Sequence, residues 1–424
     1  MLERVIQIFK IRDLRKSILY VLALLFVFRI AAHIPIPGVN LANLKEFFAS
    51  NQIFGLINIF SGGGMNNFSV VAMGVGPYIT ASIILQLLVM IVPKLEALSK
   101  EPGGYQKINS WTRWLTVPLA ALQGYGIITV LQRQSTYKII GDLSPFDLIL
   151  TIITLSAGTI FLMWIGEIIS ERKIGNGISL IIFAGIIDRL PGSVQRTLAV
   201  FDPGQIINMG LFALIAVITI VGVVIINEGT RNVPVSYARH VRGNKMYGGV
   251  STHLPLRVNM AGVIPIIFAI SLIIFPPMIA NFFVHAKSQI LVSIAQFVMS
   301  VFQNQLIYGI LYFIFVFGFT YFYTAVIFHP QQIAENLQKQ GGFIPGIRPG
   351  KHTEDYLARV TNHIIFAGAL FLGLIAILPL LIQQLVGGLN LVIGGTSILI
   401  VVSVVIEIVK QIESQLTMRE YEGL

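Results

Sequence analysis

The chain has 424 residues, of which 55% are hydrophobic and only 11% are charged, and its formal net charge is +10. Soluble domains carry about 25% charged residues, so this composition excludes a soluble globular protein. The absence of cysteine excludes disulfide bonds and thiolate metal sites.

Ten apolar stretches follow one another along the chain, and most have the length that a helix needs to cross a bilayer. A helix rises about 1.5 Å per residue, so roughly 20 apolar residues span the hydrocarbon core. We therefore predict an all-α, polytopic membrane protein. The predicted spans are Ser17–His33, Ala72–Val92, Trp114–Leu131, Phe146–Gly166, Gly177–Ile187, Ile206–Asn227, Asn259–Ala280, Leu306–Phe328, Ile364–Gln383 and Val392–Lys410. The fifth is short, and we expect it to be tilted or to begin within the bilayer.

The basic residues indicate the orientation of these spans. Of the 29 Lys and Arg residues, the great majority fall in segments that one topology places on a single side of the membrane. Because Lys and Arg are retained on the cytoplasmic side, we predict that both termini are cytoplasmic. The basic excess therefore reports sidedness, and any contact with nucleic acid is confined to the cytoplasmic loops.

Between the first two spans, on the predicted outer side, lies an unusually apolar loop. Its Ser61-Gly62-Gly63-Gly64 sequence lacks the Lys-Ser/Thr of a phosphate-binding loop. The loop either packs on its own helix bundle or enters the membrane inside a cavity, where irregular backbone is tolerated. We expect Arg29, in the first span, to be structural. It either reaches the outer interface or pairs with a backbone carbonyl.

Two long loops, residues 228–258 and 329–363, lie on the predicted cytoplasmic side. Both are rich in glycine and polar residues, and both carry several basic side chains. One interpretation is that these charges only anchor the topology. The other is that the loops form a docking platform for a large cytosolic partner with an acidic or phosphate-bearing surface.

The ten spans divide into two sets of five, in residues 1–190 and 191–424. An odd number of spans in each set places the two halves in opposite orientations, which is compatible with an inverted repeat. Some secondary transporters of small solutes are built in this way, so such a transporter is the alternative function. Ion-coupled transporters usually bury an acidic residue at mid-membrane, whereas the carboxylates here avoid the centres of the spans.

The sequence motifs of common catalytic and metal sites are missing. The chain contains no HExxH, GxSxG or P-loop sequence. Its seven histidines lie in loops or at the ends of predicted spans. We therefore expect no enzyme activity, no bound metal and no cofactor.

Five motifs, in chain order, resemble those of the SecY family of bacterial protein-translocation channels. They are Gly76–Gln86, Ile174–Ile186, Leu254–Pro265, Gly341–Gly350 and Gly394–Ser397. The resemblance extends over nearly the whole chain. It implies a central hourglass pore between two pseudo-symmetric inverted halves. Such a pore passes unfolded secretory polypeptides outward and releases transmembrane segments laterally into lipid.

The resemblance also implies which residues constrict this pore. The ring of aliphatic side chains at its waist corresponds to Ile79, Ile83, Ile182, Ile186, Ile267 and Ile400. Residues four apart share a helix face, so the second and fifth spans each present two stacked isoleucines. A small apolar ring excludes ions by dewetting and binds no passing side chain strongly. On spacing alone these residues would be ordinary helix-packing isoleucines, and the resemblance alone gives them this role.

Three further sites follow from the same resemblance. Residues 56–69 correspond to a plug, a short helix that closes the outer funnel. The expected plug residues are Leu56, Ile57, Ile59, Phe60, Gly62, Gly63, Gly64 and Met65. The lateral exit corresponds to the seam between the second and seventh spans. Gln123 and Asn259 are candidates for polar contacts across it, or else they only join neighbouring helices. The candidates for docking a cytoplasmic partner are Arg239, Arg242, Lys245, Arg348 and Lys351.

The resemblance implies a set of partners as well. These are the SecE and SecG subunits, the ATPase motor SecA, the ribosome, the translocating polypeptide with its signal sequence, and membrane lipids. The implied location is the bacterial plasma (inner) membrane. In this arrangement the chain itself is not an enzyme, because the motor or the ribosome supplies the work.

Overall fold

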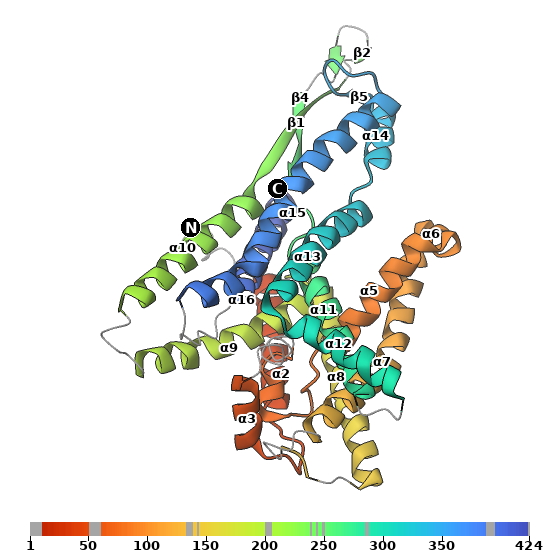
Figure 1. Cartoon of the computed structure of the whole chain (residues 1–424). Coiled ribbons are helices and arrows are strands. Elements are labelled where there is room, and N and C mark those ends of the chain that lie inside the picture. The colour runs from red at the N-terminus through yellow and green to blue at the C-terminus, as the bar shows by residue number, and fades with distance from the viewer. Residues whose placement is uncertain are drawn as a thin grey trace.

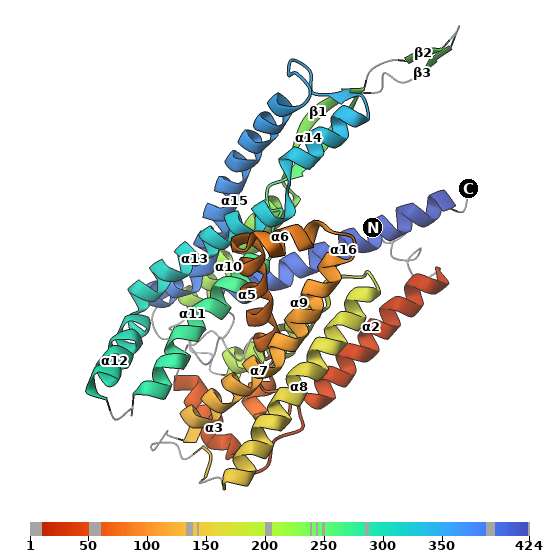
Figure 2. The same cartoon turned by 90° about the vertical axis from the view of Figure 1, so that its right-hand side faces the viewer.

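The computed structural model describes residues 11–50, 61–132, 139–141, 144–199, 206–237, 240–242, 245–247, 251–284, 288–386 and 395–422. Long helices make up most of these residues, and short strands gather at one end of the molecule (Figures 1 and 2). Each predicted span coincides with one helix. These helices are α2 (Arg12–Ala31), α5 (Gly76–Ile91), α7 (Gly104–Gln132), α8 (Pro145–Glu171), α9 (Gly177–Ala199), α10 (Ile206–Glu228), α11 (Ile264–Phe283), α13 (Gln305–Ile327), α15 (Lys351–Val386) and α16 (Gly395–Glu422).

Four helical stretches in the described part of the chain are long and apolar enough to cross a membrane by themselves. They are Gly104–Gln132, Pro145–Glu171, Gln305–Lys339 and Lys351–Leu378. A fifth span arises if α5 and α6 (Pro93–Lys100) are taken together, although the chain bends by 102° between them. The bend falls at Pro93, where the ring removes a backbone donor and disfavours a continuous helix.

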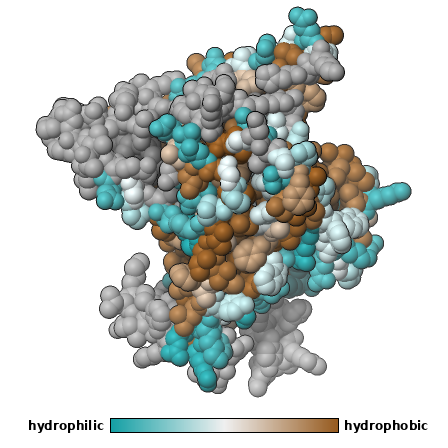
Figure 3. All heavy atoms as spheres, turned by 90° about the horizontal axis from the view of Figure 1, so that it is seen from below, coloured by the Kyte–Doolittle hydropathy of each residue, from teal (hydrophilic) through white to brown (hydrophobic). Residues whose placement is uncertain are grey.

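The outward faces of these helices are apolar, as expected for contact with lipid. On α8, for example, the side chains of Phe146 and Ile153 are 73% and 59% exposed. Seen from below, hydrophobic side chains form a band across the molecule, with hydrophilic side chains toward its edges (Figure 3). Apolar patches of this extent are rare on soluble monomers. The chain is therefore a multi-pass membrane protein.

The fifth span is longer than the sequence predicts. Helix α9 continues past Asp188 and through Pro191 to Ala199. The apolar run ends at Ile187 because Asp188 and Arg189 follow it, so hydropathy alone truncates the span. The final turns of α9 extend beyond the apolar stretch.

Short strands fold the two long loops into a single unit. Strands β1 (Thr230–Tyr237) and β4 (Ser251–Arg257) of the first loop pair antiparallel, and β5 (Gly342–Phe343) of the second loop pairs with β1. Val233 and Val235 of β1 are buried at alternate positions, as a half-buried strand requires. They share a cluster with Leu337 of α14 (Pro330–Lys339) and Leu357 of α15. Strands β2 (His240–Arg242) and β3 (Lys245–Tyr247) form a separate hairpin.

The opposite end of the molecule carries short helices and a turn. Helix α3 (Leu41–Ser50) is capped by the Asn40 side chain, which accepts hydrogen bonds from the backbone N–H groups of Ala42 and Asn43. The 3-10 helix η1 (Gly64–Asn67) packs on α3. Helix α12 (Gln289–Gln303) joins α11 to α13.

Glycine allows α8 and α9 to cross at very short range. A Cβ atom on Gly177 would lie 1.8 Å from the carbonyl oxygen of Gly166, closer than any van der Waals contact. We expect Gly177→Ala to lower the free energy of unfolding by about 1–3 kcal/mol, because overpacking forces the backbones apart. Thermal unfolding of the detergent-solubilised protein measures this change.

Gly318→Ala is the matched control, since a Cβ atom at Gly318 in α13 would meet no atom within 4 Å. That substitution is expected to leave stability unchanged or to raise it, because alanine favours helix over glycine by up to about 1 kcal/mol. Equal effects of the two substitutions would contradict the close crossing of α8 and α9.

Candidate functional site

All six isoleucines expected at the waist lie in one buried hydrophobic cluster. Helix α5 contributes two of them, α9 two, α11 one and α16 one, and each is at most 4% exposed. Their order along the chain is Ile79, Ile83, Ile182, Ile186, Ile267 and Ile400. Four helices that are distant in the sequence therefore contribute to one buried apolar cluster, which also contains residues of α2, α8, α10, α13 and α15. Residues of a pore ring must lie in such a common cluster.

Local sequence signals set the starts of two of these helices. Pro77 lies in the first turn of α5 and Pro265 in the first turn of α11, positions where proline costs no helical hydrogen bond. Gly262, just before α11, has a φ of +63°, which favours glycine. Helix α11 then packs against both α5 and α7, and α16 packs against α9.

The structure describes part of the segment expected to form the plug. Gly62 and Gly63 form a turn with φ values of +61° and +90°, and the turn leads into η1. Met65 is fully buried with residues of α3, α7 and α8. The expected short helix is therefore a single 3-10 turn in this part of the segment. Four of the named residues lie outside the described residues: Leu56, Ile57, Ile59 and Phe60.

Arg29 of α2 reaches this turn. Its Nη1 donates a hydrogen bond to the Gly62 carbonyl oxygen at 2.8 Å, and its Nη2 pairs with the Asp188 carboxylate of α9. Pairing with a backbone carbonyl, one of the two expectations for Arg29, is confirmed. Sequence reasoning missed Asp188. The available signal was its position at the outer end of the fifth span, at the same predicted depth as Arg29.

The two candidate gate residues make their hydrogen bonds at different places. The Gln123 side chain on α7 donates to the Thr80 hydroxyl on α5 at 3.4 Å. The Asn259 amide donates to the Asn227 side chain of α10 at 2.7 Å and to the Gly262 carbonyl at 3.2 Å. Asn227 in turn donates to the Ser403 hydroxyl of α16 at 2.7 Å. In this structure, Asn259 thus ties the start of α11 to α10 and α16.

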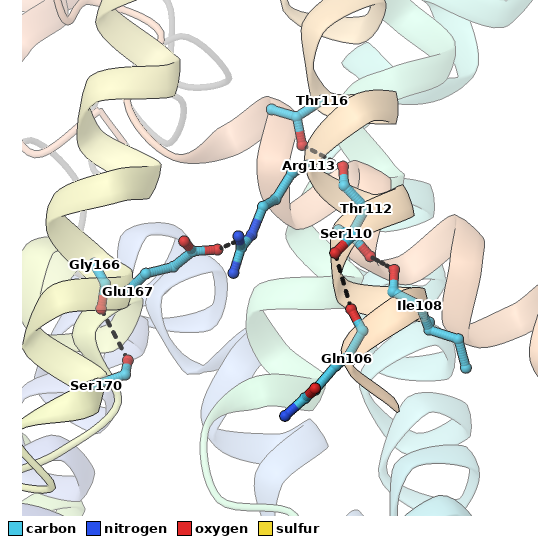
Figure 4. Close-up of polar contacts among 9 residues, drawn as sticks. All are labelled: Gln106, Ile108, Ser110, Thr112, Arg113, Thr116, Gly166, Glu167 and Ser170. Carbon is cyan, nitrogen blue, oxygen red and sulfur yellow. Dashed lines mark hydrogen bonds and ion pairs between the residues drawn. The ribbon is translucent and has the colours of Figure 1, made fainter. Parts of the chain in front are cut away.

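Several charged side chains in the described part of the chain form ion pairs between neighbouring helices. Arg113 of α7 and Glu167 of α8 point toward each other, with 2.6 Å between Nε and Oε1 (Figure 4). Lys410 of α16 pairs with Glu228 at the end of α10 at 2.8 Å. Among the described residues, no three His, Asp or Glu side chains are grouped to hold a metal. The pairs therefore fasten neighbouring helices.

The candidate docking residues lie at the strand-bearing end of the molecule. Arg348 and Lys351 are exposed, and Gly346 and Gly350 turn the backbone around Arg348 with φ values of +82° and +96°. The buried Thr353 hydroxyl donates to the Arg348 carbonyl at 3.0 Å, which fixes this turn.

The remaining docking candidates belong to the first loop. Arg242 and Lys245 face each other in the backbone register of the β2–β3 hairpin. Arg239 lies outside the described residues. The hairpin follows β1, so these positions extend from the sheet that also holds the second loop.

Known proteins match this chain over most or all of its length. The sequence model of the SecY family matches residues 69–409. The protein translocase subunit SecY of Streptomyces galbus is 43% identical over 446 residues, covering 100% of this chain and 99% of that protein. The protein of the same name from Mycobacterium bovis is 43% identical over 442 residues, with 100% and 99% covered.

Solved structures agree with this result at the level of the fold. A protein conducting channel aligns with a TM-score of 0.62 at 20% identity, covering 93% of this chain and 91% of that one. A SecY structure concerned with the plug domain aligns with a TM-score of 0.60 at 20% identity, with 92% and 90% covered. An idle yeast Ssh1 complex bound to the yeast 80S ribosome aligns with a TM-score of 0.60 at 14% identity, with 92% and 88% covered. The chain belongs to the SecY family of protein translocase subunits.

Proposed function

We propose that this chain is the pore-forming subunit of a protein-conducting channel. It passes unfolded secretory polypeptides across the membrane and releases transmembrane segments laterally into lipid. The observation that carries the proposal is the convergence of six buried isoleucines from α5, α9, α11 and α16. The translocase relatives and the channel fold support it, and neither supports the alternative of a small-solute transporter.

The isoleucine cluster is the gate of the resting channel in this proposal. Water and ions enter a narrow apolar constriction at a high free-energy cost, so close-packed isoleucines block them. The same side chains offer no hydrogen bond or charge to a passing polypeptide. Chains of many sequences can therefore slide through once the four helices separate.

Separation occurs between two halves, residues 1–190 and 191–424. Helix α11 packs on α5 and α7 across this division, whereas α9 and α16 pack together elsewhere along it. We assign the lateral exit to the α5–α11 seam and the other contact to the hinge region. Gln123 and Asn259 remain the candidates for polar contacts at the exit. Their observed bonds to Thr80 and Asn227 each lie within one half, so they hold these two side chains on either side of the seam.

The segment 56–69 is the plug in this proposal. In the SecY protein of the second solved structure, the plug domain stabilises the closed state of the translocation channel and maintains a membrane seal. Here the Gly62 turn contacts α9 beside Ile186, whereas Met65 and Phe68 are fully buried in a separate cluster with α3, α7 and α8. The contact of the Gly62 turn favours a segment seated against the closed waist.

The strand-bearing end is the cytoplasmic docking platform. Residues of both predicted cytoplasmic loops share its hydrophobic core. Four basic side chains are exposed on its surface, namely Arg231, Arg257, Arg348 and Lys351. The start of α2 and the end of α16 point toward this same end (Figure 2), which agrees with two cytoplasmic termini. A basic surface of this kind suits ribosomal RNA and acidic faces of the SecA motor.

The work of transport comes from partners, and we expect the chain to catalyse no reaction itself. SecA drives exported chains, and the ribosome drives membrane proteins during synthesis. A solved relative is bound to a ribosome. SecE and SecG complete the channel, which lies in the bacterial inner membrane among its lipids.

Reconstitution tests the proposal. The chain is purified with its subunits, inserted into vesicles and supplied with SecA, ATP and an unfolded precursor. We expect the precursor to become protected from added protease. Uptake of a radiolabelled small solute down an ion gradient, without protection of the precursor, would instead support the transporter.

A further inference from the structure

The Gly62 turn is held in a narrow seat between two helices. A Cβ atom on Gly62 would lie 2.4 Å from Cζ of Phe28 on α2. A Cβ atom on Gly185 of α9 would lie 2.1 Å from Cα of Gly62. The turn therefore has backbone contact on one side and an aromatic ring on the other. Gly185 directly precedes Ile186, so this seat adjoins the isoleucine cluster.

Arg29 is the polar group that closes this seat. Its guanidinium uses one nitrogen for the Gly62 carbonyl and another for the Asp188 carboxylate. The planar fork of arginine suits this double role, whereas a lysine ammonium offers a single point charge. The Arg29 side chain is 20% exposed and that of Asp188 is 45% exposed. Solvent screens such an ion pair, so the pair alone contributes little.

The hydrogen bond from Arg29 to Gly62 and the ion pair of Arg29 with Asp188 connect different parts of the chain. The pair joins α2 to α9, two helices that already pack together. The bond to the carbonyl joins α2 to the turn itself, and a charged donor makes such a bond stronger than a neutral one. It also acts on backbone, so it is independent of the side chains of the segment.

We propose that Arg29 is the positioning residue that holds the Gly62 turn in its seat, and that this turn leaves the waist only when the Arg29–Gly62 bond breaks. The inference rests on the proposed role of residues 56–69 as the plug. Asp188 orients the guanidinium and is secondary. Arg29 thereby sets how often the resting channel unseats its plug.

The natural absence of cysteine makes a direct test available. Met65→Cys places one thiol in the buried part of the segment, and a membrane-impermeant maleimide reports how often it is exposed. In the resting channel we expect Arg29→Met to raise the labelling rate about tenfold. Arg29→Lys, which keeps the charge and one donor, is expected between this variant and the parent. Asp188→Asn, which keeps the Gly62 bond, should stay within about twofold of the parent.

Lys16→Met is the matched control, since Lys16 is an exposed basic residue near the other end of α2. It should label at the parent rate, and thermal unfolding should be similar for all variants. An equal rise in labelling rate for Arg29→Met and Asp188→Asn would overturn the inference, because the Arg29–Asp188 ion pair, and not the bond to Gly62, would then hold the turn in place. Parent-like labelling of Arg29→Met would overturn it as well.

The plug assignment is tested separately in the same assay. The Met65→Cys parent, engaged with a stalled secretory chain, should label faster than the resting parent. An unchanged rate on engagement would remove the plug assignment itself, whatever Arg29 does. Faster labelling on engagement with no effect of Arg29→Met would remove only the role of Arg29.

Discussion

Replacing both Ile83 and Ile182 by glycine is expected to make the resting channel conduct ions, with at least a tenfold rise in conductance over the parent. The two side chains belong to the same buried cluster but to α5 and α9 respectively. Their removal widens the constriction from two sides and admits water, which a dewetted apolar neck otherwise excludes. Conductance of the purified complex in planar bilayers measures the effect.

The control for this prediction must separate a leak from a loss of stability. Removing a buried isoleucine costs about 2–5 kcal/mol, and glycine in a helix adds about 1 kcal/mol. Ile149→Gly with Ile153→Gly gives the same helix penalty on the exposed face of α8, and it should not leak. A conservative pair, Ile83→Leu with Ile182→Leu, keeps the volume and should also stay closed. Parent-like conductance of a folded glycine variant would refute the assignment of the ring.

Arg348→Glu is expected to lower motor-driven transport by at least tenfold without unfolding the channel. Arg348 is exposed on a turn that Gly346, Gly350 and Thr353 fix, so its charge is presented in a defined position. Reversal replaces an attraction to an acidic or phosphate-bearing partner by a repulsion, and such a change acts on docking. A tenfold loss corresponds to about 1.4 kcal/mol. Protease protection of a precursor in vesicles gives the rate.

Lys339→Glu is the matched control for Arg348→Glu, because Lys339 is an exposed basic residue at the end of α14 on the same platform. It changes the net charge equally but lies outside the candidate docking residues. Equal losses in both variants would mean that the overall charge of the platform matters and that Arg348 has no special role. Weaker binding of the partner to Arg348→Glu alone would support the docking assignment.

Hydropathy was sufficient to predict where the long helices lie. Each predicted span overlaps a helix because apolar runs near 20 residues have few alternatives in lipid, and four or five of these helices are by themselves long and apolar enough to cross a membrane. The predicted bounds are too short where a helix continues past its apolar run, as at the end of α9, the start of α15 and the end of α16. Backbone hydrogen bonds continue through polar residues, whereas hydropathy detects only the apolar part of a helix.

Spacing could not identify the residues that we propose for the pore ring. Ile79 and Ile83 share a helix face, as do Ile182 and Ile186, but many packed helices show such pairs. Their common cluster depends on how α5, α9, α11 and α16 pack, which sequence order does not reveal. The resemblance supplied these residues, and the structure brings them together.

Contacts between segments that are distant in the chain could not be predicted from the sequence either. The alternating valines of β1 are few, and their partners in α14 and α15 follow only after several intervening helices. Asp188 is an ordinary acidic residue at a helix end until Arg29 is placed beside it. Asn259 was a candidate either for the exit seam or for joining neighbouring helices, and the sequence could not show that its hydrogen bonds run to Asn227 and Gly262. Such pairings depend on tertiary packing rather than on local pattern.

We expect an unfolded polypeptide to pass through the apolar cluster at the isoleucines of α5, α9, α11 and α16. A photo-reactive residue at position 79 or 400, in place of the buried isoleucine, tests it with a secretory chain stalled during transport. We predict a cross-link from both positions to the stalled chain, and none from a photo-reactive residue at the exposed position 149. No cross-link from position 79 or 400, while the stalled chain is protected from protease, would contradict it.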